Sequence, residues 1–208
     1  MKTWFIADTR FGDSAILERQ ERGFKDVETM DRRLVTNWNW KVEPEDLVYH
    51  LGGVTCHESK RSKEIISSLN GTKICIRGIR DPSPKDLMKM GFSAVLEAAF
   101  MRIGDTDFYL NHEPFPRSIK HTWCLHGSVH REWKFKAVER KICLSVENWA
   151  YSPVSEKILT TYIDMCNDPW GMDESQIEDE EEKAAEKASE DKAKTKSKSK
   201  KRVKITEE

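Results

Sequence analysis

The sequence lacks a long apolar run and a recognisable targeting segment. No stretch of about 18 apolar residues is present that could span a bilayer. The first residues, Met1–Ile6, run directly into a strand-like pattern and show no apolar signal-peptide region or cleavage site. These absences predict a soluble, cytoplasmic protein that has no membrane partner.

The sequence also lacks a cysteine pair at metal-ligand spacing. Its five cysteines are an odd number, widely spaced, and none of them forms a C-x-x-C motif. This argues against a structural zinc site, a thioredoxin-like redox motif and a disulfide framework. Cys75 and Cys143 fall in apolar runs, where a free cysteine usually behaves as a small buried side chain. We expect all five to be reduced.

Over most of the chain, neither acidic nor basic residues are in excess. Residues 1–172 contain 25 Lys and Arg against 24 Asp and Glu, a balance that gives no general attraction to nucleic acid or membranes. Beyond that point, residues 173–191 hold ten acidic and two basic side chains, and residues 192–208 hold eight basic and two acidic ones. The formal charge of the whole chain therefore conceals two opposite blocks.

This change in composition predicts the domain organisation. Residues 1–168 are expected to form one domain, and residues 169–208 a charged, disordered tail, acidic at 173–191 and basic at 192–204. Such a tail is either solvated without a partner or tethers the domain to a charged partner such as nucleic acid.

The first ninety residues alternate between short apolar runs and segments with helical periodicity. Strands are predicted at Thr3–Ala7, Leu47–Leu51 and Lys73–Arg77, with helices at Val27–Trp40 and Lys63–Leu69 between them. This order is typical of β-α-β units, so the fold class is α/β.

Beyond Gly91 the pattern changes to short strands with little helix between them, which predicts a second, more antiparallel sheet. Pro153–Met165 then supplies a closing helix. Apolar surroundings predict core positions for His50 and for several tryptophans. These strands are expected at Ala94–Glu97, Phe100–Ile103, Phe108–Asn111, Thr122–Leu125, Lys134–Ala137 and Lys141–Ser145, and these tryptophans are Trp4, Trp38, Trp40, Trp123 and Trp149.

Five segments rich in polar residues and glycine follow predicted strands, where open α/β sheets place their sites. In order they are ADTRFGD at 7–13, LGGV at 51–54, RGIRD at 77–81, NHEP at 111–114 and LHGSVH at 125–130. Their order and spacing resemble the calcineurin-like metallophosphoesterase family, especially its small bacterial and phage members. The resemblance covers residues 1–163 and implies two mixed β-sheets packed as a sandwich and flanked by helices.

The resemblance also implies two divalent metals that activate water for attack on a phosphoester. This sequence departs from the family's pattern at most of the positions that hold them. Arg10 replaces a ligand His, Gly53 the bridging Asp, Ile79 the Asn ligand and Ser128 another His. Arg80 stands where the family has its catalytic His, so no residue is assigned a catalytic role.

Three of the implied metal ligands remain, namely Asp8, His112 and His130. The resemblance divides them between the two metals, so we expect no cofactor. The alternative is that they converge on one divalent metal, Mn or Zn, because two imidazoles and one carboxylate can hold a single transition metal.

Arg10 and Arg80 place fixed positive charge where the metals would lie. One hypothesis is that they bind a phosphate or another anion, because guanidinium groups suit phosphate oxygens. The other is that they pair with Asp8, Asp13 and Asp81 and fill an inert cleft.

The sequence thus predicts a catalytically inactive relative of the phosphoesterases that binds a protein partner or, failing that, a phosphorylated ligand. The alternative is a phosphodiesterase or nuclease that uses a reduced metal site. If the chain is phage-encoded, the expected location is the host cytoplasm.

Overall fold

The computed structural model describes residues 1–55, 60–114 and 121–167. The chain divides into a compact unit, Met1–Thr161, and a second unit that begins at Tyr162. The predicted tail at residues 169–208 lies outside the described residues, so its disorder and the domain end at 168 stay predictions. Within the described residues, no helix is long and apolar enough to cross a membrane.

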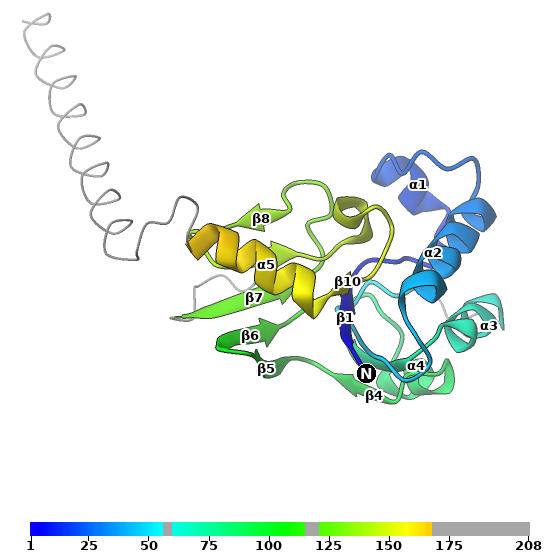
Figure 1. The fold of residues 1–208 in the computed structure, drawn as a ribbon. Coiled ribbons are helices and arrows are strands. Elements are labelled where there is room, and N and C mark those ends of the chain that lie inside the picture. Colours follow the sequence, from blue (N-terminus) through cyan, green and yellow to red (C-terminus); the bar gives the residue numbers. More distant parts are fainter. Residues whose placement is uncertain (56–59, 115–120, 168–208) are drawn as a thin grey trace, which may run out of the picture. The chain divides into compact units, whose positions relative to one another are not determined.

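The first sheet has the strand order β10-β1-β2-β3-β4 (Figure 1). Its strands β1 to β4 run parallel, and β10 pairs with β1 in the antiparallel direction. The parallel strands are linked by helical crossovers, as the alternating sequence pattern predicts. The bounds are β1 Thr3–Ile6, β2 Leu47–His50, β3 Thr72–Ile76, β4 Ala94–Leu96 and β10 Val154–Ser155.

The second sheet has the strand order β5-β6-β7-β9-β8. The central strands β6, β7 and β9 are parallel neighbours, while β5 and β8 pair antiparallel at the two edges. Both sheets are therefore mixed, and the predicted fold class is confirmed. The bounds are β5 Ala99–Ile103, β6 Thr106–Leu110, β7 Thr122–His126, β8 Phe135–Lys136 and β9 Lys141–Cys143.

The prediction for Ala94–Glu97 was wrong about its sheet. This segment was expected in the second sheet, but as β4 it pairs parallel with β3, in register Ile74↔Ala94, and the N–H of Arg77 donates to the carbonyl of Leu96 at 2.8 Å. A three-residue apolar strand carries no sequence signal that distinguishes one sheet from the other, so the neighbouring strand decides.

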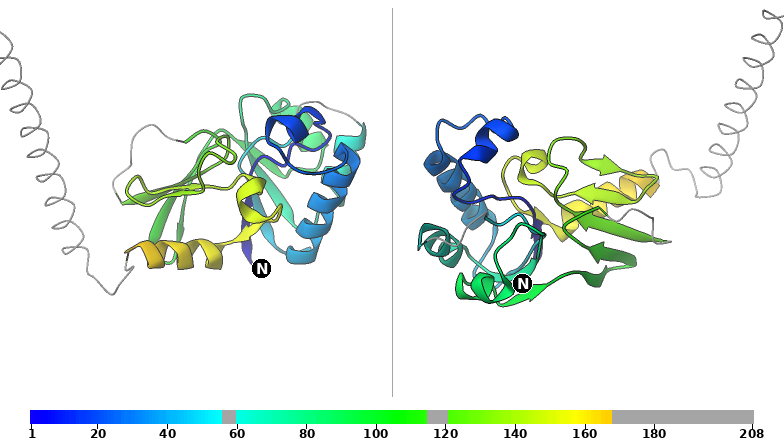
Figure 2. Two further views of the ribbon diagram at one scale, coloured as in Figure 1. Left: turned by 90° about the horizontal axis from the view of Figure 1, so that it is seen from above. Right: turned by 180° about the vertical axis from the view of Figure 1, so that it is seen from behind.

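The helices α2, α3 and α4 cover one face of the first sheet, and the second sheet lies on its other side (Figures 1 and 2). The α2 helix begins where the Asp26 side chain accepts a hydrogen bond from Thr29 N at 2.7 Å, a helix N-cap. The short helices α1 and α4 were not predicted, since five or six residues carry too little periodicity. The bounds are α1 Ala15–Arg19, α2 Val27–Lys41, α3 Lys60–Ser68, α4 Pro84–Lys89, the 3-10 helix η1 Val146–Trp149 and α5 Glu156–Asn167.

The core confirms several burial predictions and corrects one. His50, Cys75 and Cys143 are buried as expected. Trp38 is buried but Trp40 is 80% exposed, so its predicted core position was wrong. Residues two apart on a helix point about 200° away from each other, so only one of these two tryptophans can face the sheet.

The two sheets meet where their parallel strands end. Ala7, directly after β1, forms a parallel bridge with Ser145, two residues after β9. Ala7 N donates to Leu144 O at 2.9 Å, and Val146 N donates to Ala7 O at 3.1 Å. Because the carboxyl ends of both sets of parallel strands lie at this junction, the loops that follow them converge there.

Candidate functional site

The five segments predicted at strand ends lie together at this junction. Asp8 follows β1, Gly53 follows β2 and Asp81 follows β3, while His112 and His130 follow β6 and β7 of the second sheet. Backbone hydrogen bonds link neighbouring loops, and one pocket is lined by residues from four of them. The fold therefore brings together the residues that the sequence resemblance selected.

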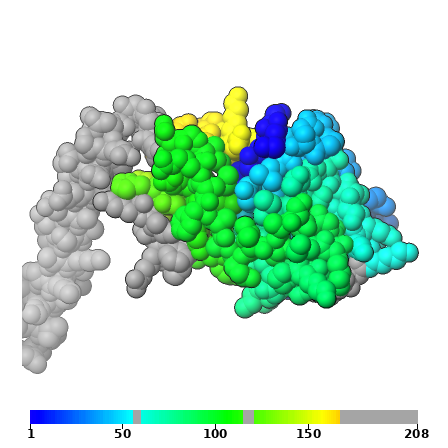
Figure 3. Space-filling view, turned by 90° about the horizontal axis from the view of Figure 1, so that it is seen from below, coloured from blue at the N-terminus to red at the C-terminus, as the bar shows by residue number. Residues whose placement is uncertain are grey.

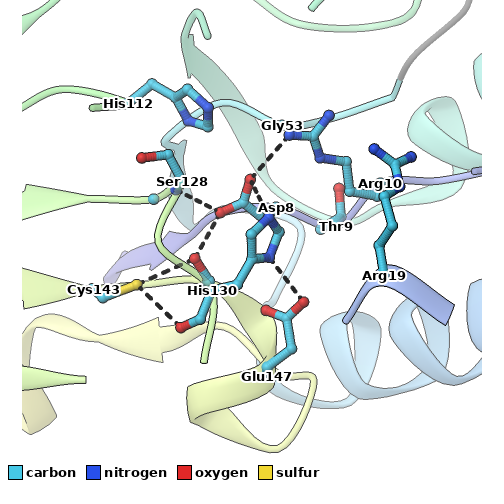
Figure 4. A network of polar contacts seen from close by, with 12 residues as sticks. Asp8, Thr9, Arg10, Arg19, Gly53, His112, Ser128, His130, Cys143 and Glu147 are labelled. Carbon is cyan, nitrogen blue, oxygen red and sulfur yellow. Dashed lines mark hydrogen bonds and ion pairs between the residues drawn. The ribbon is translucent and has the colours of Figure 1, made fainter. Parts of the chain in front are cut away.

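Asp8 is fully buried at the centre of the site (Figure 4). Its Oδ2 accepts hydrogen bonds from Ser128 N at 2.8 Å and from Ser145 Oγ at 2.6 Å. Its Oδ1 is buried without a hydrogen-bond partner, with Arg10 Nη2 at 3.6 Å and His130 Nε2 at 4.0 Å. A buried carboxylate needs a compensating positive charge, and the Arg10 guanidinium supplies it.

Two of the loops hold side-chain-bearing residues in the left-handed backbone region. Asp8 and Arg10 have φ angles of 56° and 52°, and Ser128 and His130 have 65° and 49°. This conformation is uncommon for residues other than glycine, costs on the order of 1 kcal/mol or more, and concentrates at functional sites. The strained loops distinguish this region from an ordinary surface turn.

Gly53 occupies the position of the family's bridging Asp, and little space surrounds it. A Cβ atom built at Gly53 would lie 2.2 Å from Asp8 Oδ1, and one at Gly52 would lie 2.6 Å from His112 Nδ1. Gly53 also has a φ of +67°, which side-chain-bearing residues rarely adopt. The Asp8 side chain thus fills the space that a Cβ at position 53 would need, and the His112 side chain fills the corresponding space at position 52.

His112 is buried with a fixed ring orientation. Its Nδ1 lies 2.7 Å from the carbonyl oxygen of Leu51. Because a carbonyl only accepts hydrogen bonds, Nδ1 carries a proton and donates it. The Nε2 atom is therefore the ring nitrogen left for the pocket, which His112 lines.

His130 belongs to a buried network that the motifs did not include. Its Nδ1 lies 3.0 Å from Glu147 Oε1, which also accepts hydrogen bonds from Arg22 Nη2 at 2.7 Å and Arg22 Nε at 2.9 Å. Arg22 Nη2 also donates to the backbone carbonyl of Asp8 at 2.6 Å. This network orients the His130 ring so that Nε2 faces Asp8.

The pKa of Glu147 follows from these contacts. Burial by itself would raise the pKa of the Glu147 carboxyl, but the hydrogen bond from His130 and the charge of Arg22 outweigh burial and hold this pKa below its ordinary value. The side chains of Arg22 and Glu147 are both fully buried. The network therefore contains a buried ion pair whose carboxylate stays ionised at neutral pH.

The Asp81 carboxylate accepts hydrogen bonds from the backbone of two loops. Its Oδ2 accepts hydrogen bonds from Gly53 N at 2.8 Å and Gly78 N at 2.9 Å, and its Oδ1 accepts one from Val54 N at 2.7 Å. The carboxylate is thus occupied by the backbone of the two loops after β2 and β3.

Within the described part of the chain, Arg80 does not form the ion pair that the inert-cleft hypothesis expects. Arg80 is exposed and forms no ion pair with the residues that the structure describes, because Asp81 faces the backbone instead. Arg10 does pair with Asp8, and Asp13 pairs with Arg19, whose Nη2 lies 3.2 Å from Asp13 Oδ2.

These arginines line one pocket of about 380 Å³. Arg10 and Arg80 both lie on its wall, joined by Arg19 of α1. Glu113 is the one carboxylate among the lining residues, and its Oε2 accepts a hydrogen bond from Ser128 Oγ at 3.0 Å. The remaining lining residues are Ile16, Gln20, Ile79, His112 and His130.

Sequence reasoning missed Arg19, Arg22, Ser145 and Glu147. Ser145 and Glu147 follow the end of β9, so the rule that sites collect at strand ends could have selected them. Arg19 and Arg22 lie in and just after a helix too short to predict, and no local pattern marks them. Arg22 acts through Glu147, which lies 125 positions away in the sequence.

Other titratable groups near the site are neutral because they are buried. Burial, with the nearby charges of His112 and Arg10, lowers the pKa of His50 to about 3, and burial lowers the pKa of His126 to about 4. Burial raises the pKa of the Cys143 thiol to about 11. His126 Nδ1 donates to the carbonyl of Gly127 at 2.7 Å.

The residues present do not fit the family's binuclear metal centre. The Arg10 guanidinium lies beside the Asp8 oxygen that a metal would use, and the position of the bridging carboxylate is closed. Among the described residues, no group of three or more His, Cys, Asp or Glu side chains could hold a metal ion. Asp8, His112 and His130 as ligands of a single metal stay a prediction.

Comparison with known proteins places the chain in a family. It is 31% identical over 172 residues to the uncharacterized protein MJ1445 of Methanocaldococcus jannaschii, across 78% of this chain and 92% of that protein. The chain belongs to the MJ1445 family. Gene 66 protein of Mycobacterium phage L5 is a more distant relative, 28% identical over 188 residues, covering 81% of this chain and 87% of the phage protein.

This chain is also similar to a protein of known structure from Aquifex aeolicus. The crystal structure of the protein of unknown function AQ665 matches with a TM-score of 0.64 at 25% identity, over 78% of this chain and 99% of that one. No family model matches the sequence. Two mixed sheets flanked by helices, with the strand-end loops gathered at one site, are the calcineurin-like phosphoesterase arrangement that the motifs predicted, and this fold is confirmed.

Proposed function

We propose that this protein binds a phosphate-bearing ligand in the arginine-lined pocket and does not hydrolyse it. The observation that carries the proposal is the position of Arg10, whose guanidinium lies 3.6 Å from Asp8 Oδ1, where the resemblance would put a metal ion. A fixed cation there can attract a phosphate oxygen, but it cannot generate a hydroxide nucleophile as a metal ion does.

The charge of the pocket favours an anion. Arg10 is balanced by Asp8, and Arg19 by Asp13, which leaves Arg80 as an exposed guanidinium without an ion pair among the described residues. Guanidinium groups bind phosphate through paired N–H···O bonds and stay charged at any relevant pH. Arg80 is therefore the side chain expected to contribute most to ligand affinity.

We propose that hydrolysis does not occur because the carboxylate that would bridge the two metals is missing. In-line attack between two metals requires ligands that hold both ions, and position 53 lacks the bridging carboxylate. Asp8 Oδ1 already occupies the place where a Cβ of residue 53 would stand. Arg80 in place of the catalytic His also removes the general acid that the resemblance implies.

Binding is tested by calorimetric titration with inorganic phosphate and with a nucleoside 5′-monophosphate. We expect the Arg80→Ala variant to bind about tenfold or more weakly, equivalent to about 1.4 kcal/mol. Arg102→Ala is the matched control, because Arg102 is also exposed but pairs with Asp107 on the second sheet, away from the pocket. Equal affinities for both variants and the wild type would refute the role of the pocket.

Hydrolysis is tested separately with bis-p-nitrophenyl phosphate and added Mn²⁺. The proposal expects no turnover above that of the Asp8→Ala variant. Metal-dependent cleavage that Asp8→Ala abolishes would show that the protein is an enzyme.

The rival function is a phosphodiesterase or nuclease with one metal held by Asp8, His112 and His130. Two observations favour it. Asp8 Oδ1 has no hydrogen-bond partner, and in both imidazoles the hydrogen bond to the protein is made by Nδ1, so that Nε2 is the nitrogen that could bind a metal. Elemental analysis of the purified protein decides, since this function requires stoichiometric Mn or Zn and a higher melting temperature with added Mn²⁺. The expected protein partner and the cytoplasmic location stay predictions.

A further inference from the structure

The four outer edges of the two sheets differ in length. The edge strands β10 and β8 have two residues each and β4 has three, whereas β5 has five. An edge strand presents unpaired backbone groups that can pair with another chain, and short edges limit such pairing. Among these edges, β5 offers the longest template.

Lys136 of β8 and Lys134, which directly precedes the strand, protect the β8 edge. Lys134 Nζ lies 3.8 Å from the centre of the Trp149 ring, and Lys136 Nζ lies 4.7 Å from the centre of the Trp133 ring. Lysine on an edge strand discourages pairing with another strand, because pairing would bury its charge. The β8 edge of the second sheet is therefore less suited to pairing with another chain than the β5 edge.

The β5 edge carries no lysine and exposes an aromatic side chain. Its sequence is AFMRI, and Phe100 is 69% exposed. The Phe100 ring packs on Tyr109 of β6, with the ring centres 4.8 Å apart. Figure 3 shows the face of the molecule to which the green segment containing β5 contributes.

The hydrogen-bond pattern of the β5–β6 hairpin shows which backbone groups point outward. Ile103 pairs with Thr106 next to the two-residue turn, and the register stays unbroken to Ala99↔Leu110. In such a hairpin the pair beside the turn exchanges hydrogen bonds, and the pattern then alternates along the strand. Phe100 and Arg102 therefore direct their N–H and C=O groups away from β6.

We infer that β5 pairs antiparallel with β5 of a second copy of this chain, about a twofold axis at Met101. Met101 is the middle residue of β5, so this register overlaps all five residues. It places Phe100 opposite Arg102 of the second copy, and the outward backbone groups of these two residues then meet and form two reciprocal pairs of hydrogen bonds.

The side chains favour a second copy in this register. Arg102 lies opposite an exposed aromatic ring, which provides a cation–π contact, and not opposite another Arg102. Met101 meets Met101 at the axis on the other face of the strand. The most exposed apolar side chain of β5 would thus be covered by a group of matching chemistry, and the inference does not depend on the pocket.

The oligomeric state of the full-length protein provides the first test. Light scattering after size-exclusion chromatography is expected to show a dimer, and Phe100→Lys is expected to raise its dissociation constant by roughly tenfold or more. Val138→Lys is the matched control, because Val138 is also an exposed apolar residue, 81% accessible, but lies outside β5. A monomeric wild type, or a dimer that Phe100→Lys does not weaken, overturns the inference.

Disulfide trapping tests the register. Met101 faces itself across the axis as a pair without mutual hydrogen bonds, whose Cα atoms lie about 4.5 Å apart, within disulfide reach. Met101→Cys is expected to form a covalent dimer on mild oxidation. Arg102→Cys is the control, because the two copies of residue 102 are displaced by about 7 Å along the strand and cannot bridge. Bridging by Arg102→Cys but not by Met101→Cys contradicts the proposed register.

Discussion

The inner and outer walls of the pocket differ in how their charges are satisfied. The inner wall is defined as His130, which lines the pocket, together with Asp8, Glu147 and Arg22, whose buried side chains lie behind it. The outer wall carries Arg80, which is exposed and has no ion pair among the described residues. The inner wall therefore contributes to the stability of the fold, and the outer wall is available to a ligand.

The largest effect is expected from breaking the inner ion pair. Glu147→Ala leaves Arg22 buried without its carboxylate, and removal of one partner of a buried pair typically costs about 3–5 kcal/mol. Urea unfolding measures this loss. Glu113→Ala is the control from the exposed rim and should change the free energy of unfolding by less than about 0.5 kcal/mol. Similar values for both variants would remove the distinction between the walls.

A methyl group at Gly53 tests how tightly the inner wall is packed. Gly53→Ala introduces a Cβ 2.2 Å from Asp8 Oδ1 and also strains the backbone. Gly104→Ala is the matched control, because Gly104 also has a positive φ but no atom within 4 Å of its Cβ position. We expect thermal unfolding to show an additional loss of about 1–3 kcal/mol for Gly53→Ala relative to Gly104→Ala. An equal loss would mean that Asp8 can move aside.

Acid should weaken the interior behind the inner wall. His50, which hydrogen-bonds Thr9, has its folded-state pKa lowered to about 3, so below pH 6.5 the unfolded chain binds a proton that the folded chain does not. The contribution of neutral His50 to the free energy of unfolding is complete above pH 6.5 and falls by up to about 1.4 kcal/mol per pH unit below it. The free energy of unfolding is measured by urea titration at several pH values between about 6.5 and about 4. The His50→Gln variant should lack the part of this pH dependence that corresponds to the uptake of one proton on unfolding. An unchanged slope would contradict the neutral state of His50.

The smallest effect on stability is expected at the outer wall. Arg80→Ala should leave the free energy of unfolding within about 0.5 kcal/mol of the wild type, because an exposed side chain without an ion pair contributes little. Urea unfolding at neutral pH is the measurement. A loss above about 1 kcal/mol in the free energy of unfolding would show that Arg80 supports the fold and is not reserved for a ligand.

The motifs located most of the site but not its supporting network. Asp8, His112 and His130 follow strands that the apolar pattern revealed, so the loops that carry them could be predicted. Glu147 and Arg22 could not be selected in the same way, since they meet 125 positions apart in the sequence. Two predictions were wrong, the burial of Trp40 and the sheet to which Ala94–Glu97 belongs. A local sequence pattern does not specify which side of a helix faces the core or which strand a segment pairs with.

The sequence by itself determined the α/β class, the strand-end loops and the replacement of metal ligands by Arg10, Gly53 and Ser128. Only the tertiary structure decided how the charges are paired. Arg10 faces Asp8 while Asp81 faces the backbone of a neighbouring loop, which leaves Arg80 exposed. Ion pairing depends on distances of a few ångströms between loops far apart in the chain, and these distances are set when the strand ends come together.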